Sequence, residues 1–183
     1  MKRFLWVLLL LLLAGSALAE PLRLSLEGEA TVAFTPGDDA AGLIVRAIES
    51  ARRQILVQAY SFTHRDIADA LIAARRRGVQ VQVLADPEQR QKIATSRIDD
   101  LVRGGVTVYL DGQHAAAHDK VMILDAGQPD AVLITGSFNF THAAQFRNSE
   151  NLLLIRGAPL LIEAYAANWR RHRAHSYLLK LTP

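Results

Sequence analysis

The sequence predicts an α/β fold in which helices pack on both faces of a mixed β-sheet. In the first half of the chain, short apolar runs alternate with longer segments whose apolar residues recur at helical spacing. In the second half, apolar runs follow one another without long helices between them, which favours antiparallel pairing. The chain has 183 residues, 50% of them hydrophobic, which is enough for one domain with a sizeable core.

The first half of the chain is expected to alternate strands and helices. Asp39 follows a Pro-Gly-Asp turn and suits the cap of a first helix, Gly78 ends the second, and Gly104-Gly105 ends the third. In order, we expect a strand at 30–34, a helix at 40–53, a strand at 54–60, a helix at 66–77, a strand at 79–85, a helical region at 87–103 and a strand at 106–110.

The second half is expected to be mainly strands. The run 118–124 ends at a turn-prone segment, 125–129, and strands at 131–135 and 151–155 follow. A final helix begins at Pro159. Its Leu161, Tyr165 and Trp169 should cover the sheet.

Residues 1–19 have the pattern of a secretory signal peptide: Lys2 and Arg3, then an apolar run, then Ala17-Leu18-Ala19 as a small-x-small cleavage site. The apolar run is short for a membrane span of roughly 20 residues. Residues 20–183 would then be the mature domain, periplasmic or secreted, with no stable membrane insertion after cleavage. Retention of the segment as an anchor is the alternative. Cysteine is absent, so no disulfide bears on the compartment.

Net charge says little about partners. The chain carries 21 basic and 18 acidic residues, and removal of Lys2 and Arg3 leaves it almost neutral. Any basic surface must therefore come from local placement.

The apolar run 121–124 is preceded by two residues suited to phosphate chemistry, His118 and Lys120. Successive side chains of a strand point to opposite faces, so these two share one face, while Asp119 and Asp125 point to the other. Asp125 is therefore expected to bond in the turn or to a neighbouring segment rather than to touch a substrate.

Ser137 and Asn139 share parity just beyond the strand at 131–135. Together with His118 and Lys120 they would place an imidazole, an ammonium, a hydroxyl and a carboxamide around one small volume. Lys, Ser and Asn donate to phosphate oxygens, and His can attack phosphorus or transfer a proton. We therefore expect catalysis on a phosphate ester.

The pattern H-x-K-x4-D at 118–125, followed by G-S-x-N at 136–139 and N-S-E-N at 148–151, resembles the signature of the phospholipase D superfamily. Within it, the chain is similar to the small bacterial secreted endonucleases, from about Ala33 to Trp169. The resemblance implies a metal-independent nuclease that acts on DNA, with RNA left open, through a phosphohistidine. It also implies that Glu150 holds the far nitrogen of the His118 ring. Asp125 is a structural member of the motif.

The H-x-K pattern occurs once in the sequence, whereas larger superfamily members carry two copies. A phosphohistidine mechanism needs a second imidazole. The resemblance therefore implies a two-fold homodimer in which two copies of His118 share one active site.

Two other functions stay open at this point. The same chemistry serves a phospholipase D-type lipid phosphodiesterase, although no extended apolar loop for membrane insertion is evident. A noncatalytic DNA-binding module is a further alternative, against which the complete set of chemical groups argues.

His114 and His118 are four residues apart, and Asp111 and Asp119 lie close by in the sequence, which could suggest a metal site. Paired histidines four residues apart bind zinc when they lie on a helix, but this segment is expected to be a loop followed by a strand. Lys120 supplies the fixed positive charge that the reaction needs. No metal and no cofactor are therefore expected.

Overall fold

The structure is a computed structural model that describes residues 20–181; the predicted signal peptide at 1–19 lies outside this range. Its strands are β1 (Glu29–Thr35), β2 (Gln54–Ala59), β3 (Gln80–Ala85), β4 (Thr107–Leu110), β5 (Lys120–Leu124), β6 (Val132–Gly136), β7 (Glu150–Arg156) and β8 (Tyr177–Leu178). Its helices are α1 (Ala40–Ser50), α2 (Arg65–Arg76), α3 (Pro87–Lys92), α4 (Ile98–Arg103), α5 (His142–Phe146) and α6 (Pro159–His175).

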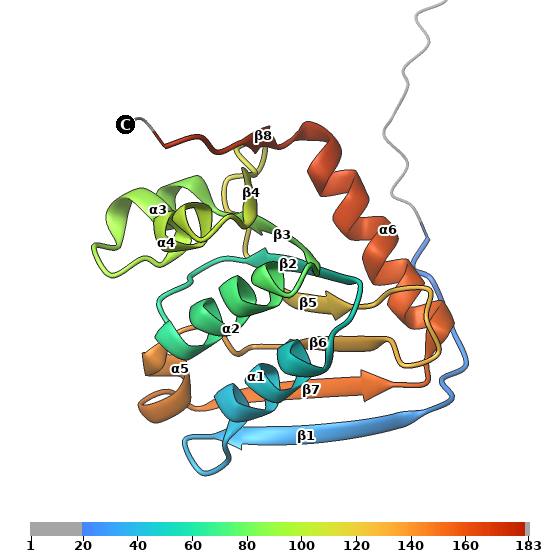
Figure 1. Ribbon diagram of the computed structural model, residues 1–183. Helices are drawn as coiled ribbons and strands as arrows, with labels where there is room; N and C mark the ends of the chain where they lie inside the picture. Colours follow the sequence, from blue (N-terminus) through green and yellow to red (C-terminus); the bar gives the residue numbers. More distant parts are fainter. Residues whose placement is uncertain (1–19, 182–183) are drawn as a thin grey trace, which may run out of the picture.

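The strands described within residues 20–181 form one eight-stranded sheet in the order β1-β7-β6-β5-β2-β3-β4-β8 (Figure 1). Strands β2, β3 and β4 are parallel and are joined by helices, as the first half of the sequence predicts. Strands β5, β6, β7 and β1 pair antiparallel, as do β2 and β5. The expected mixed sheet is confirmed.

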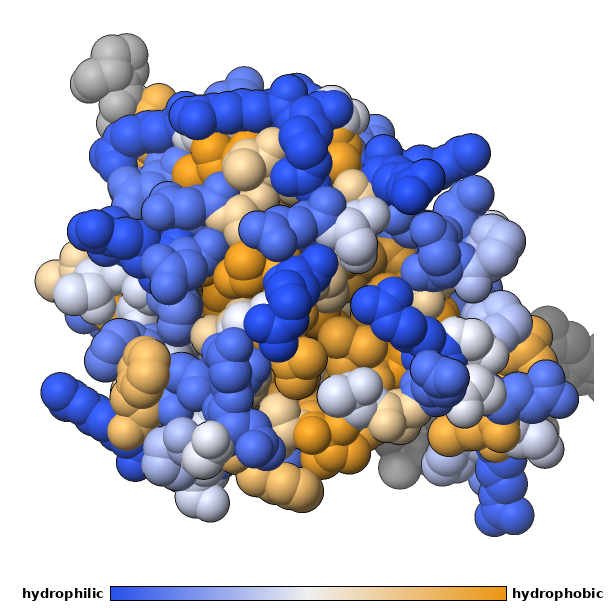
Figure 2. All heavy atoms as spheres, turned by 60° about the horizontal axis from the view of Figure 1, so that its bottom comes forward, coloured by the Kyte–Doolittle hydropathy of each residue, from blue (hydrophilic) through white to orange (hydrophobic). Residues whose placement is uncertain are grey.

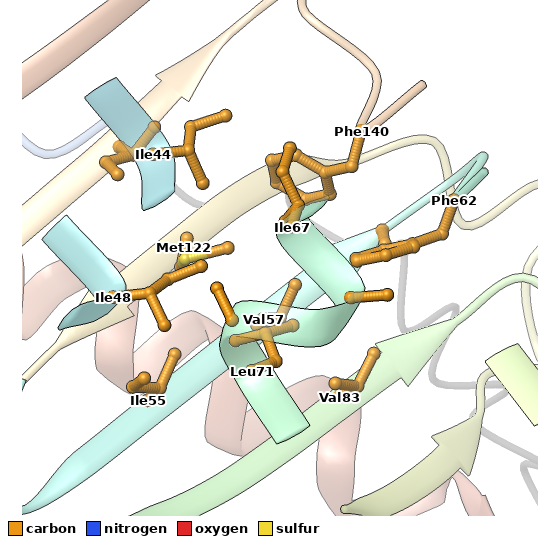
Figure 3. Packing of buried hydrophobic residues seen from close by; sticks show 14 of the residues in the cluster. Ile44, Ile48, Ile55, Val57, Phe62, Ile67, Leu71, Val83, Met122 and Phe140 are labelled. Atoms are coloured by element: carbon orange, nitrogen blue, oxygen red, sulfur yellow. The ribbon is translucent and has the colours of Figure 1, made fainter. Parts of the chain in front are cut away.

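Helices cover both faces of this sheet. On one face, α1 and α2 pack Ile48, Ile67 and Leu71 against β2 and β5, as the interleaved side chains of Figure 3 show. On the other face, α6 buries Trp169, whose indole Nε1 donates to the carbonyl of Val57 at 3.0 Å. Tyr165 and Leu161 are only partly buried there, and Ile162 and Ala166 complete the apolar face of α6.

Two of the predicted helical segments differ in the structure. The helical region at 87–103 is divided into α3 and α4, because the N–H of Arg97 donates to the carbonyl of Phe62 and α3 buries no side chain. Helix α1 ends at Ser50 rather than at residue 53. The N–H groups of Arg52 and Arg53 donate to the carboxylate of Asp125 instead of continuing the helix.

Apolar side chains reach the surface between charged ones on the side of the molecule that carries β1 (Figure 2). On β1 these are Val32 and Phe34, whose exposed fractions are 49% and 62%. Their neighbour Ala33 belongs to the core under α1 and α2, so Val32 and Phe34 point to the face on which α6 lies. Among the described residues, none of the helices has the length and hydropathy of a membrane span.

The register brings several strand ends to one edge of the sheet. Ala59 of β2 pairs with Lys120 of β5 and Ala85 of β3, and Ala85 pairs with Leu110 of β4. The starts of β5 and β7 and the end of β6 therefore lie on the same edge as the carboxyl ends of β2, β3 and β4. Polar groups from distant parts of the sequence meet there.

Candidate active site

His118 lies in the loop just before β5, not within the strand as expected, and Lys120 is the first strand residue. Lys120 pairs with Ala59, and the N–H of Tyr60 donates to the carbonyl of Asp119 at 3.0 Å. These backbone contacts fix the position of the segment 118–120 beside the end of β2. Strand β5 therefore begins at Lys120, two residues later than the predicted strand start at residue 118.

The side chains of His118 and Lys120 meet despite this difference. The Lys120 ammonium donates to Nδ1 of His118 at 2.9 Å, and the ring of Tyr60 lies over both groups, 4.3 Å from the His118 ring centroid and 5.1 Å from Nζ. Burial lowers the pKa of Lys120 from its ordinary value, while the negative charges of Asp119 and Glu150 oppose this shift. The negative charge of Glu150, on strand β7, thus acts on the Lys120 ammonium of strand β5.

Gly136 makes the turn that follows β6 possible. Its φ is +143°, and a Cβ there would lie 2.4 Å from the carbonyl oxygen of Asn151, so a side chain would clash with backbone. That carbonyl accepts from the N–H groups of Ser137 and Phe138 at 3.1 and 3.3 Å. The close approach of β7 therefore holds Ser137 at the edge of the sheet.

Ser137, Asn139 and Glu150 gather at this edge. The Ser137 hydroxyl donates to Oε2 of Glu150 at 2.6 Å, and Asn148 Nδ2 donates to Oε1 at 2.9 Å. Oδ1 of Asn139 is buried and has no hydrogen-bond partner among the described residues. A buried polar atom without a hydrogen-bond partner lowers the stability of the fold. Such an atom is typical of a site that binds a ligand.

The hydrogen bond that was expected between Glu150 and His118 is not formed within the described chain. Glu150 instead accepts from Ser137 and Asn148, and Nδ1 of His118 is occupied by Lys120. The physical reason is that each of these groups already has a hydrogen-bond partner of the right kind.

A cleft of about 520 Å³ brings the predicted residues together. It is lined by His118, Asp119, Lys120, Val121, Thr135, Gly136, Ser137, Asn139, Glu150 and Tyr165. All five residues that were predicted to be catalytic line this cleft. The ammonium, hydroxyl and carboxamide groups suit the oxygens of a phosphate, and an exposed imidazole lies beside them.

Asp125 lies at the other end of β5 and does not line the cleft. Its carboxylate is buried, 4% exposed, and accepts from the N–H groups of Arg52, Arg53 and Gln54 at 2.7–2.8 Å. The hydrogen bonds to a neighbouring segment agree with the role that strand parity predicts for it.

Comparison with known proteins agrees with this geometry. Residues 44–172 match the model of a protein family described as cardiolipin synthase, PLD-like domain. The chain belongs to the phospholipase D superfamily. A phospholipase D of Rickettsia bellii is 39% identical over 144 residues, which are 78% of this chain and 68% of that protein.

Two solved structures are similar to this chain over their whole length. Nuc from Salmonella typhimurium, a phospholipase D family member, has a TM-score of 0.77 at 34% identity and covers 85% of this chain and 100% of its own. NucT from Helicobacter pylori has a TM-score of 0.75 at 26% identity and covers 84% and 100%. The chain is thus a phospholipase D superfamily hydrolase that acts on phosphodiester bonds.

Sequence reasoning missed the place of Tyr165, which was expected only to cover the sheet and which also lines the cleft. It also missed a second group, in which Asp111 and His114 meet His172 and His175 of α6 rather than His118 and Asp119. A signal existed in the spacing of His172 and His175, which are three residues apart on one helical face.

Proposed function

We propose that this protein is a sequence-nonspecific, metal-independent endonuclease that hydrolyses nucleic-acid phosphodiester bonds. The observation that carries the proposal is the cleft itself, which opens at the sheet edge and is lined mainly by polar side chains. A phosphate of an extended polymer can lie across such a cleft without burying its flanking sugars and bases. The similarity to Nuc and NucT over their whole length supports the same conclusion.

In the proposed reaction, Nε2 of one His118 attacks phosphorus, and the P–O bond to the leaving oxygen breaks. A second imidazole gives its proton to that oxygen. The same imidazole then takes a proton from water, whose oxygen attacks phosphorus and breaks the P–N bond. Lys120, Ser137 and Asn139 donate to the phosphoryl oxygens as negative charge develops on them.

Phosphate binding would also prepare the nucleophile. Attack by Nε2 requires the proton of His118 to reside on Nδ1, and an acceptor to hold it there. Without substrate, Nδ1 accepts from Lys120, and Glu150 accepts from Ser137. A phosphate that recruits both donors frees Nδ1 and the Glu150 carboxylate for each other.

The second imidazole is proposed to come from another copy of the chain. His118 is the only imidazole among the described residues that line the cleft. His142 packs against Phe146 of α5, and His114 contacts Asp111. A two-fold dimer that brings two clefts together supplies the missing group.

An exposed apolar surface beside the cleft supports such a dimer. Phe34 is 62% exposed and pairs with Asn151, whose backbone N–H donates to the Ser137 hydroxyl at 3.0 Å. Exposed apolar side chains next to a site that lacks one group are expected at an isologous interface.

Export to the periplasm or the medium is part of the proposal and is based on the sequence pattern of residues 1–19. A lipid phosphodiesterase is the second candidate, because the relative from Rickettsia bellii is named phospholipase D. Both substrates present the same phosphodiester to the cleft.

The test is a parallel assay of the purified protein on plasmid DNA, RNA and phosphatidylcholine vesicles at 25 °C, each with and without EDTA. We expect nucleic-acid cleavage that survives EDTA, because Lys120 supplies the positive charge that a divalent ion otherwise provides. Cleavage that stops with EDTA and returns with magnesium, an ion that prefers oxygen ligands, would contradict the metal-independent mechanism. Hydrolysis of the lipid alone would replace the nuclease by the second candidate.

A further inference from the structure

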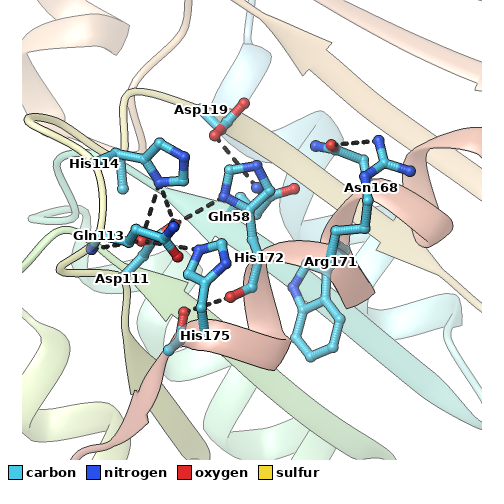
Figure 4. A network of polar contacts seen from close by, with 12 residues as sticks. Gln58, Asp111, Gln113, His114, Asp119, Asn168, Arg171, His172 and His175 are labelled. Carbon is cyan, nitrogen blue, oxygen red and sulfur yellow. Dashed lines mark hydrogen bonds and ion pairs between the residues drawn. The ribbon is translucent and has the colours of Figure 1, made fainter. Parts of the chain in front are cut away.

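A second group of titratable side chains lies at the same edge of the sheet, outside the cleft lining. Asp111 follows β4, and its carboxylate is almost fully buried, with 1% of the side chain exposed. His114 Nδ1 lies 3.1 Å from this carboxylate, His172 Nδ1 2.8 Å and His175 Nε2 3.2 Å. Figure 4 shows the three rings converging on the carboxylate from different sides.

The fold brings these residues together from two distant segments. Asp111 and His114 belong to the loop between β4 and β5, whereas His172 and His175 form one face of the last turn of α6. The N–H of Gln113 donates to Oδ1 of Asp111 at 3.2 Å and orients the carboxylate. Three of the six histidines of the chain meet here.

We infer that Asp111, His114, His172 and His175 form a binding site for a divalent transition-metal ion of the zinc type. Their donor atoms all lie within 4.8 Å of one another. In a tetrahedral zinc site with bonds of about 2.0–2.1 Å, neighbouring donor atoms are about 3.4 Å apart. The three distances from carboxylate to imidazole already approach that value.

The remaining adjustment is small and falls on partly exposed side chains. The His114, His172 and His175 ring centroids are 4.9–5.4 Å apart, which already suits three ligands of one ion. The donor atoms lie up to 4.8 Å apart, so the rings must rotate to bring all three nitrogens onto that ion. The side chains of His114 and His175 are 45% and 29% exposed and have room to turn. The buried carboxylate stays fixed.

The donor set selects the class of ion. Three imidazole nitrogens and one carboxylate oxygen suit zinc and its neighbours in the first transition row. Magnesium and calcium prefer sites built from oxygen ligands, and this group offers only one carboxylate. Four protein ligands also fill a tetrahedral site, which is typical of a structural rather than a catalytic zinc ion.

The position of the site explains what such an ion would do. The loop between β4 and β5 begins at Asp111 and carries His118 near its other end. An ion held by Asp111, His114 and α6 would fix the start of this loop. The end of the loop is fixed by the Ala117 N–H, which donates to Asp86 Oδ2 at 2.9 Å. The ion orders the loop that presents His118 and takes no part in hydrolysis.

The experiment uses protein expressed without a histidine tag, stripped with EDTA and dialysed. Titration calorimetry with zinc chloride should show about one equivalent bound per chain. With cobalt(II), the visible spectrum should show the bands of a tetrahedral site. The variants His114→Ala and His172→Ala should weaken zinc binding by more than the roughly 10- to 100-fold that loss of an outer-shell partner causes. His142→Ala, an exposed histidine outside the group, is the matched control and should bind zinc like the wild type.

Zinc should also slow hydrogen exchange in residues 112–119 of the wild type and leave the exchange of His114→Ala unchanged, because the ion joins the loop to α6. Because the His114 side chain is exposed, the His114→Ala variant should fold like the wild type. The inference would be overturned if the wild type bound no stoichiometric zinc, or if His114→Ala and His172→Ala bound zinc as tightly as the wild type. Either result would mean that hydrogen bonds alone hold this group together. None of these readouts depends on nuclease activity, so this inference and the proposed function fail independently.

Discussion

The two ends of strand β5 carry polar residues of the same sequence motif in opposite states. At the carboxyl end, Asp125 is buried, and its carboxylate accepts three backbone hydrogen bonds. At the amino end, His118 is exposed in a cleft, and Oδ1 of Asn139 nearby lacks a partner within the described structure. The five residues of β5 separate the buried, hydrogen-bonded Asp125 from His118 and Asn139, which line an open cleft.

Burial and hydrogen-bond partners thus distinguish the roles of residues that belong to one motif. A buried carboxylate whose oxygens accept from backbone N–H groups stabilises the fold and is not accessible to a substrate. An exposed imidazole beside donors that can turn to a phosphate is accessible to a substrate. Substitutions at the two ends should therefore separate activity from stability.

The largest expected effect is on activity, at the amino end. His118→Ala should lower the rate of phosphodiester hydrolysis by at least about 10³-fold, because it removes both the nucleophile and the imidazole that transfers protons. The melting temperature should change little, since the side chain is exposed. Initial rates on plasmid DNA and thermal unfolding of the same preparations measure both quantities.

An inactive His118→Ala protein that has also lost several degrees of melting temperature would not separate the two roles. Retention of more than about a tenth of the wild-type rate would exclude His118 as the nucleophile.

The second effect is on stability, at the carboxyl end. Asp125→Asn keeps the size of the side chain and a residue type that tolerates the positive φ of 51°. It replaces one accepting oxygen by an NH₂ group that faces backbone N–H donors. Because hydrogen bonds to a charged group contribute roughly 1.5–3 kcal/mol each, we expect the free energy of unfolding to fall by about 2–4 kcal/mol. Chemical denaturation measures this change.

Activity of Asp125→Asn, assayed well below its melting temperature, should stay close to that of the wild type. The matched control is Asp130→Asn, an exposed residue in the following turn, which should change neither stability nor activity. If Asp125→Asn were as inactive as His118→Ala at an unchanged melting temperature, the contrast between the two ends of β5 would be wrong.

Most of the sheet is predictable from the sequence because its signals are local. Apolar runs bounded by turn residues locate β2, β3, β6 and β7, and the absence of long helices after β5 predicts antiparallel pairing. The end of α1 is not predictable in this way. It depends on Asp125, more than 70 residues further along the chain, whose carboxylate takes the N–H groups of Arg52 and Arg53.

The same limit applies to the candidate site. The spacing of His118, Lys120, Ser137 and Asn139 predicts a shared phosphate site, and all four line the cleft. The partners of Glu150 are not predictable from spacing, because its hydrogen bonds from Ser137 and Asn148 depend on how β6 and β7 pair. The meeting of Asp111 and His114 with α6 depends on the packing of the last helix across the sheet, which no local pattern encodes.

The smallest effect tests whether the amino end of β5 is completed by a second chain. Equal amounts of wild type and His118→Ala, refolded together, should pair at random, so that about a quarter of the dimers are fully wild type. A mixed dimer has one imidazole where the reaction needs two, so activity should fall to about a quarter of that of an equal total of wild-type protein.

Wild type refolded with Asp130→Asn is the control and should keep full activity. Retention of half the activity after verified subunit exchange would mean that each chain works alone. The second proton donor would then come from within the chain, and His114 and His142 would be the first histidines to replace.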